Sequence, residues 1–311
     1  MGRSKRRIKQ IFIIINLILF VIALFFSYKM YQDYQSNKDE KEKIVNNYKE
    51  IMNDKELDDQ KIKDINDKID ELNNIDSKIK TTRDDVYKLS SELEKKVKSG
   101  ESKKKIAYLT FDDGPYYNTY KVLKILKQNK VKATFFTTNT NGEHCYDNKS
   151  ANCHEVYKAI ADENHTLANH TYTHGWNRGL YTNTNTFMDA IKKQENLIKE
   201  KTGVTTNIAR FPGGSSTPGS TKGKAMKEAL YKAGYGWVDW TASDGDGGYL
   251  PNYATVMKNF KGSIGDKIEV VLFHDYHQVT TAMLPEVIKY LRDNNYIILP
   301  LFYESVMIHK N

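Results

Sequence analysis

Hydrophobic and polar positions follow three different patterns along the chain. An apolar run covers residues 11–26 and is broken only by Asn16. Isolated apolar residues then recur at steps of three and four through residues 62–93, between Lys, Asp, Glu and Asn. From Ile106 onward, short runs of β-branched and aromatic residues alternate with stretches of helical periodicity. The pattern therefore predicts an apolar helix, a polar helical segment and a folded α/β domain.

The alternation in the third segment predicts its fold class. We expect helices near 120–127, 154–161, 186–202, 222–233 and 281–293, and strands at 106–111, 131–137, 207–211, 235–240, 268–273 and 296–300. Strands that alternate with helices are typical of a parallel sheet covered by helices. Residues 102–311 suffice for an open sheet or for a distorted (β/α) barrel. In both folds, active groups lie at the C-terminal ends of the strands.

Glycine and proline divide the chain at the same place. Of the 18 Gly, 17 lie from Gly100 onward, together with all 6 Pro. Compact domains use these residues in their turns, so the first hundred residues cannot form a compact multi-turn domain. The composition also excludes a collagen-like, disulfide-framework or wholly disordered chain. We therefore predict that the core is built from the C-terminal two thirds.

The N-terminal pattern predicts a membrane anchor over residues 1–28. Five basic residues within residues 3–9 precede the apolar run, and about 17–25 apolar residues span a bilayer. A cleaved signal peptide is the alternative, but no small-residue cleavage site follows the run. Because basic flanks stay in the cytoplasm, the rest of the chain is expected outside the cell membrane. Much of the formal net charge of +8 then reflects topology, and nucleic-acid binding is not needed to explain it.

Residues 29–101 are expected to form a helical stalk. Steps of three and four between apolar residues are typical of a coiled-coil seam. Two successive steps of three, at Ile69, Leu72 and Ile75, would overwind such a coil locally. A coiled-coil homodimer and a solvated, unpaired helical linker both remain open, because single polar helices are marginal without packing.

Reactive side chains follow the predicted strands of the C-terminal domain. Such residues are common singly, but their convergence on one edge of one sheet is hard to explain by ordinary turns. One carboxylate with two imidazoles forms a metal site with open positions, and a second carboxylate could accept a proton from water. A further His could protonate a leaving group, and an Arg could keep the base ionised. These parts predict hydrolysis of an acyl bond, and the residues are Asp112, Asp113, His170, His174, Arg210, Ser243, Asp244, Asp246, His274 and Asp275.

Over residues 104–303, the chain resembles the polysaccharide deacetylase family (NodB homology, carbohydrate esterase family 4). Residues 110–115, Thr-Phe-Asp-Asp-Gly-Pro, are similar to its first motif, and residues 170–174, His-Thr-Tyr-Thr-His, to its second. The resemblance implies that Asp112 is the general base and that Asp113, His170 and His174 bind the metal. It further implies one divalent ion, Zn²⁺ in the first place, with Co, Mn, Ni or Fe as alternatives.

Two further motifs of the family have counterparts. Residues 210–214, Arg-Phe-Pro-Gly-Gly, resemble the third motif, which implies that Arg210 pairs with the base and that the Gly213 N–H stabilises the oxyanion. Residues 272–274, Leu-Phe-His, resemble the fifth. There the resemblance implies that Leu272 lines the acetyl-methyl pocket and that His274 is the general acid.

The fourth motif departs from the family pattern, Asp-x-x-Asp-Trp. Counting from Trp240 places Asp246 at the Asp that supports the acidic His, with Ser243 at the leading Asp and Gly247 at the Trp. Asp244 remains an alternative partner for His274. The third motif departs too, with Gly213 where Tyr is usual, so one wall of the substrate groove is expected to differ.

The resemblance implies a metal-dependent N-deacetylase acting on a cell-envelope glycan, with N-acetylglucosamine of peptidoglycan as the leading substrate. N-acetylmuramic acid, an exopolysaccharide, a chitin-like oligomer and xylan are alternatives, and so is a non-catalytic glycan-binding or scaffold protein. The two cysteines, Cys145 and Cys153, could form a disulfide outside the membrane or remain free thiols. Aromatic residues near the motifs could stack on sugar rings or simply pack, and they are Tyr116, Tyr117, Trp176 and Tyr249.

Overall fold

The computed structural model describes residues 93–248 and 252–303, together with Leu24, residues 27–29 and 31–32, Gln35, Ser91 and Ser305. The predicted anchor and stalk therefore lie almost entirely outside the described residues. Within the described part of the chain, no helix is both long and apolar enough to cross a membrane. The anchor and the coiled coil remain predictions.

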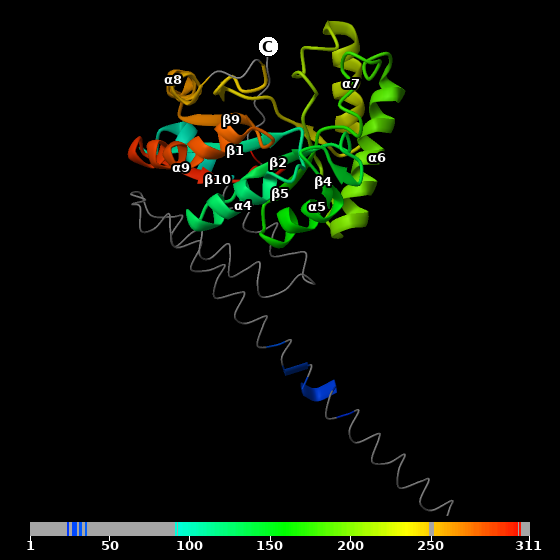
Figure 1. Ribbon diagram of the computed structural model, residues 1–311, viewed down its shortest axis with the longest axis horizontal. Helices are drawn as coiled ribbons and strands as arrows, with labels where there is room; N and C mark the ends of the chain where they lie inside the picture. Colours follow the sequence, from blue (N-terminus) through cyan, green and yellow to red (C-terminus); the bar gives the residue numbers. More distant parts are fainter. Residues whose placement is uncertain are drawn as a thin grey trace, which may run out of the picture.

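The C-terminal domain alternates strands with helices, as the periodicity indicates (Figure 1). Every helix predicted for this domain is present, and the helix ends differ from expectation by a few residues. The sequence pattern did not reveal β5, α8, β8 or the hairpin of β3 and β4. The elements are β1 (Lys105–Asp112), α4 (Thr119–Gln128), β2 (Thr134–Thr137), β3 (His144–Cys145), β4 (Asn148–Asn152), α5 (Cys153–Asp162), β5 (Thr166–Asn169), α6 (Thr184–Thr202), β6 (Ile208–Ala209), α7 (Ser220–Lys232), β7 (Gly236–Trp237), β8 (Ala242–Ser243), α8 (Tyr253–Ser263), β9 (Ile268–His274), α9 (Gln278–Asp293) and β10 (Tyr296–Leu299).

The main sheet is parallel, which confirms the predicted α/β class. Its strands follow the order β7-β6-β5-β2-β1-β9-β8. The central strand β1 has two neighbours on one side, because β10 pairs with residues 105–108 and β2 pairs with residues 110–112. On the other side, β9 pairs with residues 106–112. The long, fully buried β1 thereby fixes the register of the strands around the site.

The two end strands of the sheet, β7 and β8, show that the sheet must curl. They are consecutive in the chain and are joined only by residues 238–241. Five peptide units reach at most about 18 Å, whereas a flat path of seven strands would separate its ends by about 29 Å. The sheet therefore bends toward closure, as in a distorted barrel with a seam between β7 and β8.

Helices cover the outside of this curled sheet (Figure 1). The larger apolar cluster joins residues of β1, β2 and β9 to the inner faces of α4, α5, α8 and α9. In α9, buried residues recur at helical spacing and include Met283, Leu284, Val287, Ile288 and Leu291. A smaller cluster lies around α6, α7 and Phe211. Fully burying one such side chain stabilises a fold by about 1.5–3 kcal/mol, so these helices hold the strand ends in place.

The end of the predicted stalk contacts the sheet. Residues 93–99 are helical, and Leu93 and Val97 are buried. The buried Glu94 accepts a hydrogen bond from the Tyr108 hydroxyl at 2.7 Å. Since Tyr108 lies in β1, the last turns before Gly100 pack directly on the C-terminal domain.

Candidate active site

Parallel strand ends bring the predicted residues to one edge of the sheet. In the β1–β9 ladder, Asp112 is the direct partner of His274. His170 follows β5, Arg210 follows β6 and Asp246 follows β8. Because all these strands run in the same direction, their C-terminal ends meet, as expected for this fold class.

The loop after β1 turns sharply to present Asp113. This residue adopts a left-handed backbone with φ of 71°, which is unusual for a residue other than Gly. Gly114 follows, and a Cβ atom there would lie 2.5 Å from Asp275 Oδ2. Only glycine therefore lets this loop pass over the buried Asp275 carboxyl group.

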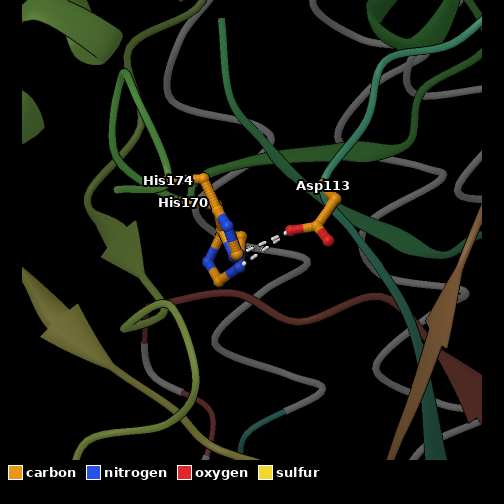
Figure 2. A group of neighbouring side chains, drawn as sticks. All are labelled: Asp113, His170 and His174. Carbon is orange, nitrogen blue, oxygen red and sulfur yellow. Dashed lines mark ion pairs between the residues drawn. The ribbon is translucent and has the colours of Figure 1, made fainter. Parts of the chain in front are cut away.

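Asp113, His170 and His174 form the group of potential metal ligands found among the described residues (Figure 2). Asp113 Oδ1 lies 3.4 Å from His170 Nε2 and 3.0 Å from His174 Nε2. Ligand atoms that lie 2.0–2.1 Å from a tetrahedral zinc ion are about 3.3 Å apart from one another. Asp113 Oδ1 is buried without a hydrogen-bond partner among the described residues. The three side chains therefore fit a divalent metal ion.

The surroundings prepare these side chains as ligands. The backbone carbonyl of Arg210 lies 2.9 Å from His170 Nδ1, so Nδ1–H donates there and Nε2 keeps its lone pair for a metal. Burial alone would raise the pKa of Asp113, but the contacts with His170 and His174 outweigh it and hold that pKa well below its ordinary value. Asp113 is thus a carboxylate at neutral pH.

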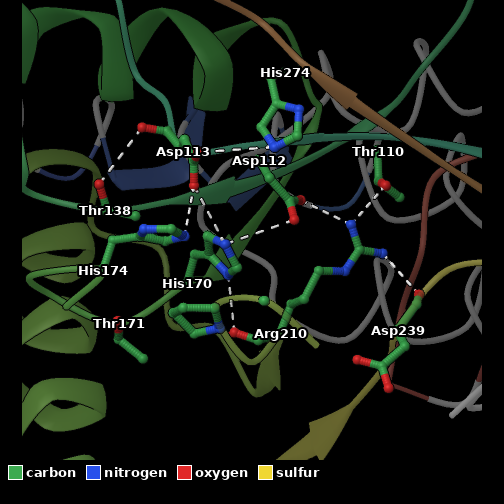
Figure 3. A network of polar contacts seen from close by, with 12 residues as sticks. Thr110, Asp112, Asp113, Thr138, His170, Thr171, His174, Arg210, Asp239 and His274 are labelled. Atoms are coloured by element: carbon green, nitrogen blue, oxygen red, sulfur yellow. Dashed lines mark hydrogen bonds and ion pairs between the residues drawn. The ribbon is translucent and has the colours of Figure 1, made fainter. Parts of the chain in front are cut away.

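A buried arginine, Arg210, donates a hydrogen bond to Asp112 (Figure 3). Arg210 Nη1 donates to Asp112 Oδ1 at 2.7 Å and to Thr110 Oγ1 at 2.8 Å. Its Nε donates to the Val238 carbonyl and its Nη2 to the Asp239 carbonyl. A buried cation is tolerated only when it is paired and hydrogen-bonded, and Arg210 meets both conditions. Its charge lies directly against the Asp112 carboxylate and fixes the position of Oδ1.

A second ion pair lies beside the metal ligands. His274 Nδ1 is 2.6 Å from Asp246 Oδ1, and Asp246 Oδ2 accepts hydrogen bonds from the His274 N–H and the Thr280 hydroxyl, both at 2.8 Å. Burial alone would lower the pKa of His274, but Asp246, aided by the charges of Asp113 and Asp112, raises it to about 9. The imidazole is thus cationic at neutral pH, with Nε2 3.7 Å from Asp113 Oδ2.

Asp244, the alternative partner of His274, has a different position. Its Oδ1 accepts a hydrogen bond from the Asp246 N–H at 3.1 Å. Burial and the charge of Asp246 raise the pKa of Asp244 well above its ordinary value. The structure therefore places Asp246, and not Asp244, against the imidazole.

The other expected site residues lie around these two pairs. Leu272 is buried in β9 opposite Thr110 of β1. Gly213 is exposed in the loop after Arg210, with φ of 76°. A Cβ atom on Gly247 would lie 2.8 Å from His274 Cε1, so the glycine backbone packs directly against the ring. Tyr249 lies outside the described residues.

Cys145 and Cys153 form a disulfide. It closes the segment that contains β3, the turn and β4, next to the N-terminus of α5. Trp176 is half exposed in the loop after His174, and Tyr116 contacts Tyr276 with ring centroids 5.1 Å apart.

Sequence reasoning missed two residues that support the site. The backbone carbonyl of Asp239 accepts a hydrogen bond from the Arg210 guanidinium. Its carboxylate accepts two more from Ser215, one from the backbone N–H at 2.9 Å and one from the hydroxyl at 2.6 Å. Thr280 holds Asp246 from the first turn of α9. Asp239 lies near the end of the predicted strand 235–240, whereas Thr280 had no distinguishing sequence context.

The family model of polysaccharide deacetylases matches residues 99–235. A peptidoglycan-N-acetylglucosamine deacetylase of Bacillus cereus is 31% identical over 198 residues, which cover 62% of this chain and 68% of that relative. The chain belongs to the polysaccharide deacetylase family.

Solved structures of this family share the fold. The catalytic domain of a peptidoglycan N-acetylglucosamine deacetylase from Eubacterium rectale is 32% identical, with a TM-score of 0.60, and the match covers 67% of this chain and 93% of that structure. A polysaccharide deacetylase from Bacillus cereus is 28% identical, with a TM-score of 0.57, and the match covers 65% of this chain and 94% of that structure. The matched region is thus nearly the whole of both domains.

Proposed function

We propose that the protein is a metal-dependent hydrolase that removes N-acetyl groups from N-acetylglucosamine in peptidoglycan. One observation carries the proposal. Asp112, held by Arg210, and His274, held by Asp246, both border the cluster of Asp113, His170 and His174. Amide hydrolysis needs a proton acceptor for water and a proton donor for the departing amine. The Asp112–Arg210 pair offers the proton acceptor, and the His274–Asp246 pair offers the proton donor.

Asp113, His170 and His174 would hold the metal. Two imidazole nitrogens and one carboxylate oxygen suit Zn²⁺ and also Co, Mn, Ni or Fe, and they leave positions open for water and substrate. When bound, the ion supplies Lewis acidity, which polarises a carbonyl and lowers the pKa of water from 15.7 to about 7.

Asp112 acts as the general base in this proposal. Its Oδ1 is occupied by Arg210, while Oδ2 lies 3.6 Å from His170 Nε2 and so borders the cluster. Oδ2 is therefore the oxygen that accepts the proton of the attacking water. Arg210 fixes the orientation of the carboxylate, so that Oδ2 faces the cluster.

His274 acts as the general acid. Asp246 occupies Nδ1, so the proton that leaves must come from Nε2, the nitrogen nearest the cluster. Protonation of the amine makes it a competent leaving group as the C–N bond breaks. The Gly213 N–H would stabilise the developing oxyanion, and Leu272 would contact the acetyl methyl group.

The substrate assignment rests on relatives and on the predicted topology. Relatives from Bacillus cereus and Listeria monocytogenes are named peptidoglycan N-acetylglucosamine deacetylases. A membrane anchor at residues 1–28 and a stalk at 29–101 would place residues 102–311 outside the membrane and facing the cell wall. An insoluble, adjacent polymer suits such a tethered enzyme.

The test is acetate release from purified peptidoglycan by the metal-loaded protein, together with mass spectrometry of muropeptides from cells with and without it. We expect acetate release and a higher acetylation level in cells that lack the protein. An unchanged acetylation profile would remove the peptidoglycan assignment. Bound metal without acetate release from any glycan would favour a non-catalytic glycan-binding protein.

A further inference from the structure

Two tyrosine rings lie open to solvent just outside the catalytic loop. Tyr117 is 43% exposed and Tyr120 is 37% exposed. Their centroids are 5.8 Å apart in an edge-on arrangement, a favourable geometry for aromatic pairs. Single exposed aromatic residues are ordinary, but these two rings contact each other at the start of α4, close to Asp113 in the chain.

The backbone beneath these rings is fixed from one side by Asp147. Its carboxylate accepts hydrogen bonds from the Tyr117 N–H at 2.9 Å and from the Asn118 N–H at 2.8 Å. Asp147 lies between β3 and β4, within the segment that the disulfide closes. Two amides on one carboxylate leave Tyr117 little freedom to reorient its backbone.

Asn118 fixes the same backbone from the other side. Its Nδ2 donates to the Asp275 carbonyl at 2.8 Å and to Thr281 Oγ1 at 2.7 Å. Asp275 follows His274, so the loop of the tyrosines is joined to the loop of the general acid. The exposed rings are thereby ordered before any ligand arrives, which lowers the entropic cost of binding.

Aromatic surface continues from these rings toward the catalytic residues. Tyr116 precedes Tyr117 and contacts Tyr276. Tyr276 in turn lies beside His274, with ring centroids 5.6 Å apart. Tyr116 and Tyr276 are half-buried, whereas Tyr117 and Tyr120 are exposed. A ligand that reaches His274 along this side passes the exposed pair first and the half-buried pair next.

We propose that Tyr117 and Tyr120 form a sugar-binding subsite, positioned by Asp147, for a unit of the glycan that lies outside the catalytic centre. The proposal rests on the proposed function, because it takes the occupant to be the chain that enters the site. The apolar face of a sugar ring packs on an aromatic ring, while the tyrosine hydroxyls can meet its polar rim. The subsite would make the enzyme prefer a polymer over a single acetylated sugar.

The test compares long N-acetylglucosamine oligosaccharides with the single sugar on the full-length, metal-loaded protein. Tyr117→Ala and Tyr120→Ala should each raise KM for the long oligosaccharide by roughly three- to tenfold, the range that one aromatic contact contributes. Its kcat should stay unchanged, because a contact far from the reacting atoms provides uniform binding. Values for the single sugar should not move. Tyr231→Ala, which removes a 72% exposed tyrosine from α7, is the matched control.

Asp147→Ala tests the positioning role. The substitution removes neither tyrosine but releases the backbone that carries Tyr117. It should therefore raise KM for the long oligosaccharide without lowering kcat. The thermal unfolding midpoint shows whether the variant is folded. If Asp147 only stabilised the fold, the midpoint would fall while the KM of the folded protein stayed at the wild-type value. That result would overturn the positioning claim.

Calorimetric binding of the long oligosaccharide separates the subsite from the proposed function. Equal Kd and KM for wild type and Tyr117→Ala, with acetate release intact, would overturn the subsite and leave the function in place. Weaker binding by Tyr117→Ala without acetate release from wild type would refute the function and support the subsite. A wild-type protein that neither binds nor deacetylates the oligosaccharide would overturn both.

Discussion

Replacing Asp246 by Asn should move the pH at which the enzyme loses activity. Asp246 is fully buried and contacts His274 through both carboxylate oxygens, at 2.6 Å to Nδ1 and 2.8 Å to the backbone N. Asn retains the shape and the hydrogen-bonding size of this side chain but removes its charge. Burial lowers the pKa of His274, and the substitution would remove the Asp246 charge that chiefly opposes this effect.

The size of the effect follows from the pKa of His274. Asp246 and the nearby carboxylates raise that pKa to about 9, and without the charge of Asp246 it should fall to about 6.5 or below, the ordinary value for His. At pH 7.5, the cationic fraction of His274 would drop from roughly 97% to about 9%, so the rate should fall about tenfold. The general acid works while protonated, so activity declines as pH rises through its pKa, and the substitution moves this decline to lower pH.

The assay is kcat/KM for acetate release between about pH 6 and about pH 10, which reports the pKa values of essential groups in the free enzyme. Both proteins carry the same metal, so its effect on His274 is common to the two profiles. Asp244→Asn is the matched control below about pH 7: Asp244 lies on the same loop, its pKa is raised to about 8 so that it is largely neutral there, and Asn resembles its neutral form. If Asp246→Asn lowers the rate equally at every pH and the midpoint stays in place, Asp246 does not set the proton affinity of His274.

Three further predictions concern single positions. Asp112→Asn should lower acetate release by about 10²–10⁴-fold, as expected for loss of a general base, while atomic absorption shows wild-type metal content; lost metal would make Asp112 a ligand instead. Gly247→Ala places a Cβ 2.8 Å from His274 Cε1, and because that ring is held by its ion pair, kcat should fall by up to about 10²-fold. Gly248→Ala, where a Cβ meets no heavy atom of the described residues within 4 Å, is the control, and equal rates for the two variants would show that the ring yields. Burial lowers the pKa of His165 to about 3, so its neutral form stabilises the fold above about pH 6.5 and this contribution is lost as pH falls toward 3. Between pH 7 and pH 5, urea unfolding should therefore show about 2 kcal/mol more loss in wild type than in His165→Gln; equal losses would contradict the assignment.

The sequence predicted the fold best where strands are long and fully buried. The strand β1 reads as a continuous apolar run because neighbours cover both its edges and helices cover its face. The strands β6 and β7 were predicted but are shorter than expected, with two residues each. The strand β8 also contains two residues, too few for a period to emerge, and it was missed. In α8, only Val256, Met257 and Phe260 are buried, so its apolar face was not recognised.

The candidate site was predictable where side chains follow strand ends. Parallel topology alone brings Asp112 and His274 together, and the register pairs them directly. The supporting contacts were not accessible in the same way. Asp239 acts through its backbone carbonyl, a group that every residue has, and Thr280 reaches Asp246 from a helix that begins after the last motif. Such contacts depend on three-dimensional distances between distant segments, which residue types do not encode.

The seam between β7 and β8 has a consequence for how the enzyme fails. The link across it supplies the Val238 and Asp239 carbonyls that hold Arg210, and the same guanidinium holds Asp112. A thermal fluctuation that separates β7 from β8 would weaken the hydrogen bonds of Arg210 and thereby release Asp112, while the outer helices remain intact. Heating should accordingly lower turnover before it melts the secondary structure.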